Sequence, residues 1–274
     1  MNITFIGGGN MATAIIGGLL QRGWDRNQLR VVEIMAAARE KLEQTFRIKT
    51  FSGMDDEALN ADCLVLAVKP QNMRQVAVQL GSHLRGQIVL SIAAGIRLAD
   101  LARWLGTQDC ILVRAMPNTP ALIGAGITSF YSFPPQHMLA PQQRKQIESV
   151  MEAVGTVLWV RSEEDLDAVT AVSGSGPAYV FYFIEALEQA ALELKLPPEI
   201  AKKLALETFL GSAKLALESN DPVATLRERV TSKGGTTERA LKSMETDGIK
   251  NAIIRAVKTA ADRSRELGDE LGRG

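Results

Sequence analysis

The chain has 274 residues, 46% of them hydrophobic, which is enough for two domains with cores of their own. Its 31 basic and 31 acidic residues cancel, so the charge balance gives no reason to expect nucleic acid or an anionic membrane as a partner. The chain enters strand-like sequence at once, without a basic leader, and no apolar run is long enough to cross a bilayer, so we expect a soluble cytoplasmic protein.

The first half of the chain alternates between strand-like and helix-like segments. Residues 3–6 form a short apolar strand that ends in glycines, and residues 11–21 carry apolar positions at helical spacing. Further strands are expected at residues 29–32, 64–68, 88–92 and 111–114, and a charged helix at residues 36–46. This alternation predicts an α/β fold with a Rossmann-type, doubly wound parallel sheet, which we assign to residues 1–162.

The glycine-rich turn after the first strand is a candidate dinucleotide site. Its sequence, Gly7-Gly8-Gly9-Asn10-Met11-Ala12, has the G-x-G-x-x-A pattern. Gly7 allows the tight turn, Gly9 lets a pyrophosphate approach the backbone, and Ala12 lets the helix pack close to the strand. The amides of Asn10 and Met11, at the positive end of the helix, would hold the phosphates. A glycine-rich turn without a ligand is the alternative.

An acidic residue ends the second strand and bears on the choice of dinucleotide. Glu33 lies 21 residues beyond Ala12, where a carboxylate would accept hydrogen bonds from the ribose 2′-hydroxyl and repel a 2′-phosphate. We therefore expect NADH or NADPH as the cofactor, with a preference for NADH. A solvated surface glutamate is the alternative.

Three later strand ends are expected to line the same cleft. Ala67-Val68-Lys69-Pro70 closes the third strand, and Lys69 either faces the cofactor or is solvated. Ser91-Ile92-Ala93-Ala94-Gly95 provides small residues where a ring system could pass close to the backbone. The run from Arg114 to Pro120 contains two prolines, which fix a rigid turn around Asn118 and Thr119 and predict a positioned polar pair.

Two cysteines, Cys63 and Cys110, lie in apolar strand-like runs. We expect both to be buried small hydrophobic residues, because their spacing fits neither a metal site nor a disulfide framework. We expect no metal.

The second half, residues 163–274, is expected to contain helices only. The segment from Ser173 to Tyr179 is typical of a helix start, with serines for capping and Pro177 in the first turn. The helix that follows is apolar nearly all round for two turns, and another helix at residues 199–217 is rich in leucine and alanine. One protomer could hardly bury such wide apolar faces, so we predict an obligate homodimer through these helices.

A polar segment in this half is a candidate receptor for a small carboxylate. In Thr231-Ser232-Lys233-Gly234-Gly235-Thr236-Thr237-Glu238, two glycines and two threonines open a new helix, where free amides and hydroxyls lie together. An ordinary helix capping box is the alternative, and it would explain a threonine at the helix start with Glu238 shortly after it. It would not explain the two glycines or the serine and threonine that precede them. We therefore favour a ligand site.

The chain resembles the pyrroline-5-carboxylate reductases along essentially its whole length. Several blocks in the right order carry this resemblance: the opening G-x-G-N-M motif, Ala67-Val-Lys-Pro70, Ser91-Ile-Ala-Ala-Gly95, Met116-Pro-Asn-Thr-Pro120, Ala171-Val-Ser-Gly-Ser-Gly-Pro-Ala-Tyr179, Thr231-Ser-Lys-Gly-Gly-Thr-Thr237 and Arg263-Ser-Arg-Glu-Leu267.

The resemblance implies that NAD(P)H reduces 1-pyrroline-5-carboxylate to L-proline, the last step of proline biosynthesis, in a helix-swapped dimer, with rings of dimers in some members. It implies substrate contacts at Glu163, Ser232, Gly235, Thr236 and Thr237, and cofactor contacts at Ile6, Gly7, Gly8, Gly9, Asn10, Met11, Glu33, Ala67, Val68, Lys69, Pro70, Ile92, Ala93 and Ala94.

Three positions depart from the family pattern. Lys233 replaces the usual proline of the substrate block, which predicts a looser loop or an extra charge near the substrate carboxylate. Glu33 stands where many members carry serine, in line with a preference for NADH. Met54 replaces a common asparagine that faces the adenosine, which weakens that contact.

The expected mechanism is direct hydride transfer from nicotinamide C4 to imine C5. Thr237 is the expected catalytic residue, whose hydroxyl hydrogen-bonds the ring nitrogen. The backbone amides of Gly235 and Thr236 are expected to hold the substrate carboxylate. Both histidines, His83 and His137, lie outside every block and are expected at the surface.

Two alternatives remain open at this point. One is a β-hydroxyacid dehydrogenase, which needs a lysine base on the first long helix of the second half, but residues 178–193 contain no lysine. The other is a non-enzymatic dinucleotide-binding protein with a helical interaction module.

Overall fold

The computed structural model describes residues 1–107, 109–133 and 139–273, so the prediction for His137 lies outside the described residues. The chain divides into two compact units, Met1–Ser175 with Ala260–Gly274, and Gly176–Thr259. In the described part of the chain, no helix is both long and apolar enough to span a membrane.

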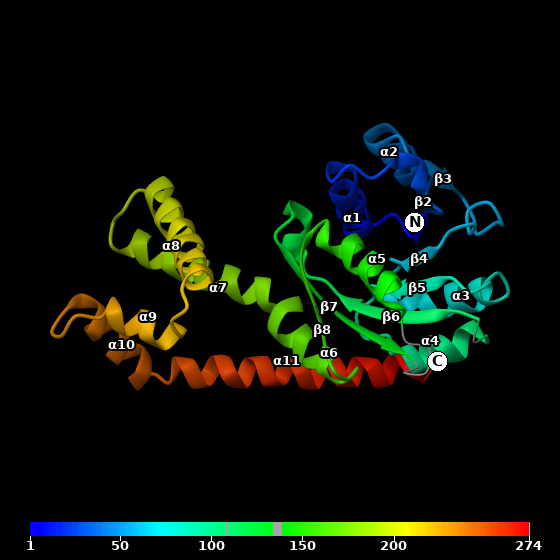
Figure 1. The fold of residues 1–274 in the computed structure, drawn as a ribbon. Coiled ribbons are helices and arrows are strands. Elements are labelled where there is room, and N and C mark those ends of the chain that lie inside the picture. Colours follow the sequence, from blue (N-terminus) through cyan, green and yellow to red (C-terminus); the bar gives the residue numbers. More distant parts are fainter. Residues whose placement is uncertain (108, 134–138, 274) are drawn as a thin grey trace. The chain divides into compact units, whose positions relative to one another are not determined.

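The first unit is built on one eight-stranded sheet (Figure 1). Its order is β3-β2-β1-β4-β5-β6-β7-β8, and the first six of these strands are parallel neighbours. The order 3-2-1-4-5-6 is that of a dinucleotide-binding Rossmann sheet, which confirms the predicted fold class. The strands are β1 (Ile3–Ile6), β2 (Leu29–Val32), β3 (Lys49–Phe51), β4 (Cys63–Leu66), β5 (Ile88–Ser91), β6 (Ile111–Met116), β7 (Gly126–Phe133) and β8 (Gly155–Trp159).

Helices cover both faces of this sheet because successive residues of each buried strand point to opposite faces. Phe5 packs with α1, α2 and α5 on one face, and Ile6 packs with α3 and α4 on the other (Figure 1). These helices are α1 (Asn10–Gln21), α2 (Ala36–Phe46), α3 (Pro70–Gly81), α4 (Leu98–Leu105) and α5 (Pro141–Glu152), and η1 (Arg26–Gln28) is a short turn before β2.

Three strands of the sheet, β3, β7 and β8, were not predicted. β3 has only three residues, and β7 returns antiparallel to β6 after a 3-10 turn, η2 (Thr119–Ile123). β8 then pairs parallel with β7, so the edge beyond β6 departs from the all-parallel prediction.

The first unit also contains helical residues from beyond the sheet. α6 (Asp165–Val169) runs into a π-helical turn, η4 (Thr170–Gly174), and the end of α11 (Ile249–Gly272) packs near α4 through Leu271. Ser173 therefore lies inside a π turn, whereas the sequence predicted a capping position for it. The helix itself begins at Gly176, with Pro177 in its first turn as predicted.

The second unit is entirely helical in its described residues. It contains α7 (Gly176–Glu193), α8 (Pro198–Glu218), α9 (Val223–Arg229), α10 (Thr236–Thr246) and the first part of α11. Large apolar side chains on α7 and α8 are exposed in the single chain, among them Phe181 at 65% and Tyr182 at 71%. Such an exposed apolar surface is typical of a subunit interface, in line with the predicted self-association.

Both cysteines are buried and free, as predicted. Burial, and secondarily the neighbouring Asp62 carboxylate, raises the pKa of the Cys63 thiol to about 12. At neutral pH this thiol is therefore a protonated core residue.

Candidate active site

The glycine turn between β1 and α1 has the geometry that a pyrophosphate requires. Gly7 has a φ of 103°, and a Cβ there would lie 2.8 Å from the Ala67 carbonyl oxygen, so only glycine fits. A Cβ at Gly9 would meet no atom within 4 Å, so its backbone is open to a ligand. Gly9 is also the N-cap of α1 and no side chain caps the helix, which leaves its first amides free for phosphate oxygens.

The carboxylate of Glu33 is fixed beside this turn. Its Oε2 accepts a hydrogen bond from the Gly8 amide at 2.9 Å, and its Oε1 accepts one from the Met35 amide at 2.9 Å. The side chain therefore points from the end of β2 toward the glycine turn. This is where the adenosine ribose of a bound dinucleotide lies in a Rossmann sheet.

The predicted segments at the ends of β4 and β5 lie on the other side of β1. Ala67 donates its amide to the Ile6 carbonyl at 2.9 Å, and Pro70 begins α3 with exposed Lys69 as its N-cap. Ile92 donates its amide to the Leu66 carbonyl at 3.2 Å. The strand order thus brings the opening glycines and both later segments to the carboxyl edge of one sheet.

A hollow beside α1 lies apart from most of the predicted cofactor residues. It has a volume of about 390 Å³ and runs along α1 between Thr13, Gln21, Leu122 and Ile123. Of the predicted cofactor residues only Asn10 borders it, so we assign it no role.

In the second unit, Gly235 is the N-cap of α10. No side chain caps this helix, and Glu238 accepts the amide of Gly234 at 2.6 Å, so the threonine cap of a capping box is absent. The Gly235 amide donates to the Ser232 carbonyl at 3.0 Å, and a Cβ on Gly235 would lie 2.5 Å from Ser232 Oγ. The sequence analysis assigned the substrate carboxylate to the amides of Gly235 and Thr236, but the Gly235 amide is occupied by this hydrogen bond. The amides that remain available in the first turn of the helix are those of Thr236 and Thr237.

Residues 231–237, which lead into the first turn of α10, are called the α10 loop below, and a hollow of about 660 Å³ borders them. Gly234 and Gly235 contribute to its wall, together with three basic and three acidic side chains: Arg227, Arg239, Lys242, Glu228, Glu238 and Glu245. Because the charges balance, this wall has no net positive charge that would attract an anion.

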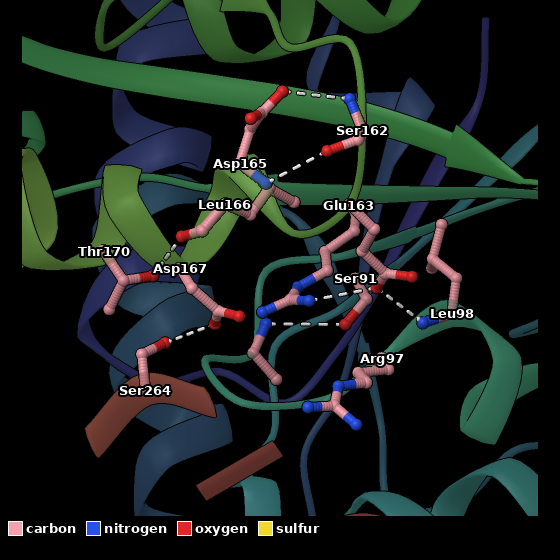
Figure 2. Close-up of polar contacts among 12 residues, drawn as sticks. Ser91, Arg97, Leu98, Ser162, Glu163, Asp165, Leu166, Asp167, Thr170 and Ser264 are labelled. Atoms are coloured by element: carbon pink, nitrogen blue, oxygen red, sulfur yellow. Dashed lines mark hydrogen bonds and ion pairs between the residues drawn. The ribbon is translucent and has the colours of Figure 1, made fainter. Parts of the chain in front are cut away.

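Glu163 belongs to the first unit and is already engaged there. Its Oε1 accepts a hydrogen bond from the Leu98 amide at 2.8 Å (Figure 2) and one from Arg114 Nη1 at 3.0 Å. The substrate contact that the resemblance implies for Glu163 would fall to the other carboxylate oxygen, and it stays a prediction.

Asn118 holds the turn after β6, as the two flanking prolines predict. Its Oδ1 accepts the Ile127 amide at 2.9 Å, and its Nδ2 donates to the Ser173 carbonyl at 3.2 Å. The side-chain amide thus ties β7 and the π turn together. Thr119, the second member of the predicted polar pair, is exposed, so the observed contacts support a positioned role for Asn118 alone.

Two buried polar contacts near Glu163 were not predicted from the sequence. Arg114 is 2% exposed, and its only local signal is a single charge in an otherwise apolar strand. Asp167 and Ser264, joined by a 2.6 Å hydrogen bond, lie 97 residues apart and gave no local signal (Figure 2).

His83 is half-buried, with its ring near the Asp56 carboxylate. Among the described residues, no group of three or more side chains of the usual metal-binding types comes together.

Two family models match the chain. One, described as pyrroline-5-carboxylate reductase dimerisation, covers residues 163–267, and the other, described as NADP oxidoreductase coenzyme F420-dependent, covers residues 2–95.

Curated relatives and solved structures agree with these models. A pyrroline-5-carboxylate reductase from Pseudomonas aeruginosa is 43% identical over 271 residues, 98% of this chain and 98% of that protein. One from Pasteurella multocida is 40% identical, with 97% of each chain covered. The structure of a Coxiella burnetii pyrroline-5-carboxylate reductase matches with a TM-score of 0.89 and 40% identity, over 97% of this chain and 98% of that one. A Plasmodium falciparum pyrroline carboxylate reductase with NADP bound has a TM-score of 0.85 and 28% identity, with 98% of each chain covered.

Proposed function

The chain belongs to the pyrroline-5-carboxylate reductase family, and from that membership we infer that it reduces 1-pyrroline-5-carboxylate to L-proline with a nicotinamide dinucleotide. The observation that carries this inference is similarity across the full length, which includes both the glycine turn and the α10 loop. Family membership decides against the alcohol dehydrogenase and the non-enzymatic alternatives.

The residues at the carboxyl edge of the sheet fit a dinucleotide. Gly9 is open and α1 is uncapped, and Ala94 is exposed in the segment after β5. We propose the full predicted set as cofactor contacts, from Ile6 to Met11, with Glu33, Ala67 to Pro70 and Ile92 to Ala94. When bound, the reduced nicotinamide supplies a hydride to C5 of the imine while the ring nitrogen gains a proton, which yields proline and the oxidised cofactor.

The α10 loop is proposed to hold the substrate carboxylate. The amides of Thr236 and Thr237 are available at the positive end of α10, and Ser232 adds a hydroxyl beside them. Gly235 contributes by its lack of a side chain, because a Cβ would strike Ser232 Oγ.

Thr237 is the proposed catalytic residue. Its hydroxyl hydrogen-bonds the ring nitrogen and so orients the C5 face toward the hydride. A threonine hydroxyl is a weak acid, so the proton reaches the nitrogen before binding or through water. Lys233 is exposed and places a cation within this loop, between Ser232 and Gly234.

The finer cofactor choice follows from Glu33. A carboxylate pinned by the Gly8 and Met35 amides is well placed to accept a 2′-hydroxyl and to repel a 2′-phosphate. We therefore propose a preference for NADH over NADPH.

We further propose that residues 163–274 form a dimerisation and substrate domain, that the dimer forms through α7 and α8, and that the enzyme acts in the cytoplasm. The exposed apolar side chains of both helices support the dimer. A ring of dimers is the larger assembly that the resemblance suggests.

The direct test is an NADH absorbance assay with the purified protein and 1-pyrroline-5-carboxylate. We expect imine-dependent loss of absorbance with an equal molar yield of proline. Oxidation of NADH by an alcohol substrate, or none with the imine at saturating concentrations, would overturn the assignment.

A further inference from the structure

The loop after β5 is held by contacts that neither cofactor nor substrate binding explains. It covers residues 92–97 and connects β5 to α4. In a Rossmann sheet the adenosine lies toward β2 and the nicotinamide on the opposite side of β1, toward β4 and β5. The position of this loop therefore affects how the nicotinamide end of the cofactor is bound.

On its buried side the loop is anchored by Glu163. Arg97, the N-cap residue of α4, forms no side-chain cap, and the Glu163 carboxylate accepts the Leu98 amide instead. The same oxygen atom pairs with the guanidinium of Arg114, whose side chain is only 3% exposed. Because a buried guanidinium without a partner is costly, this pairing fixes the carboxylate and with it the end of the loop.

On its outer side the loop is anchored by the last turns of α11. Arg97 Nη1 forms a 2.6 Å ion pair with Asp269, and Nη2 donates to the Arg265 carbonyl at 3.3 Å. A Cβ on Gly95, whose φ is 73°, would lie 3.0 Å from Leu271 Cδ1.

The helix itself is held close to the loop. A Cβ on Gly268 would lie 3.0 Å from Arg97 Nε, so glycine permits the guanidinium to lie against the helix. Ser264 donates to the buried Asp167 carboxylate, which secures α11 to α6 (Figure 2).

We propose that Arg97 and Asp269 on one side, and Glu163 with Arg114 on the other, are positioning residues that set the 92–97 loop for the nicotinamide half of the cofactor. The end of α11 then supports the cofactor site, a role that the dimerisation and substrate functions do not give it. The inference rests on the proposed dinucleotide site.

The sharpest test compares two neighbouring acidic residues on α11. Asp269 pairs with Arg97 of the loop, whereas Glu270 pairs with Arg263 on the same helix. Asp269→Asn and the matched control Glu270→Gln each remove one partly exposed carboxylate charge, but only the first touches the loop.

NADH affinity is measured by fluorescence titration without imine, and KM values by steady-state assays. We expect Asp269→Asn to raise the Kd and KM for NADH about threefold, which is the scale of a partly exposed ion pair, and Glu270→Gln to leave both unchanged. Arg97→Ala should raise them about fivefold, with partial recovery in Arg97→Lys. The KM for the imine should stay constant throughout.

Glu163→Gln tests the buried side, with the melting temperature recorded. A rise in the Kd for NADH without imine supports a positioning role, because a pure substrate contact leaves that Kd unchanged. NADH affinities equal to the parent enzyme in Asp269→Asn and Arg97→Ala would overturn the inference. Failure of the parent enzyme to bind NADH would instead overturn the proposed function.

Discussion

Replacement of Glu33 by serine is the most informative change to the cofactor site. The carboxylate is held by the Gly8 and Met35 amides, each at 2.9 Å, so it cannot swing away from a cofactor without losing these bonds. A 2′-phosphate carries about −1.5 to −2 charges near neutral pH. At about 4 Å, each pair of unit charges repels by ~1 kcal/mol even in bulk water, so the penalty against NADPH is about 1.5–2 kcal/mol.

Loss of the hydrogen bond from the 2′-hydroxyl to the carboxylate adds about 1.5 kcal/mol against NADH in the variant. Together the two effects change the relative preference by about 3 kcal/mol, or roughly a hundredfold. We therefore expect Glu33→Ser to shift the ratio of kcat/KM for NADPH over that for NADH upward by about two orders of magnitude.

Steady-state kinetics with both cofactors at saturating imine measure this ratio. Glu33→Gln is the matched control for charge, since it keeps the chain length and one acceptor oxygen. Glu33→Gln should have a higher kcat/KM for NADPH than the parent enzyme and a higher kcat/KM for NADH than Glu33→Ser. A parent enzyme that prefers NADPH, or a ratio that changes less than twofold in both variants, would refute the reasoning.

Further predictions concern the substrate, the core and the assembly. Thr237→Ala should lower kcat at least tenfold while the Kd for NADH stays within twofold, and unchanged turnover would remove its catalytic role. The Cys63 thiol keeps its proton up to a pKa of about 12 when folded but only to about 9.0 when unfolded. Between these values the folded state binds more protons than the unfolded state, so this thiol lowers the free energy of unfolding by ~1.4 kcal/mol for each pH unit above 9. Urea denaturation of the parent and of Cys63→Ala across this pH range measures the effect. If the parent loses no more unfolding free energy with rising pH than Cys63→Ala does, the prediction is wrong. Sedimentation at micromolar concentration should show a dimer or larger species, and a stable folded monomer would contradict the proposed interface.

Much of the fold follows from local pattern. The β1–α1–β2–α2 order was predicted from the apolar strands and the helical spacing of α1, and the charged segment at residues 36–46 gave α2 with its observed bounds. β3 was missed because three residues are too few to show a period. β7 was missed because its sequence, GITSFYSF, is mixed in polarity and continues from a 3-10 turn.

Long-range polar contacts could not be predicted in the same way. The family resemblance pointed to Glu163 as a substrate contact, but it gave no sign of the ion pair with Arg114, which lies 49 residues earlier in the chain. Arg97 and Asp269 are farther apart still and carry no shared motif. The glycine turn and the α10 loop were recognisable because backbone conformation there demands glycine within a few residues of sequence.

The central claim is that the α10 loop presents the imine carboxylate within hydride reach of a nicotinamide bound at the opening glycines. A crystal structure of the assembled enzyme with NADH and proline measures this directly. We predict the proline carboxylate on the amides of Thr236 and Thr237, with its C5 atom about 3.5 Å from nicotinamide C4. If proline lies elsewhere, or if these two segments are far apart in every subunit pairing of the assembly, the claim is wrong.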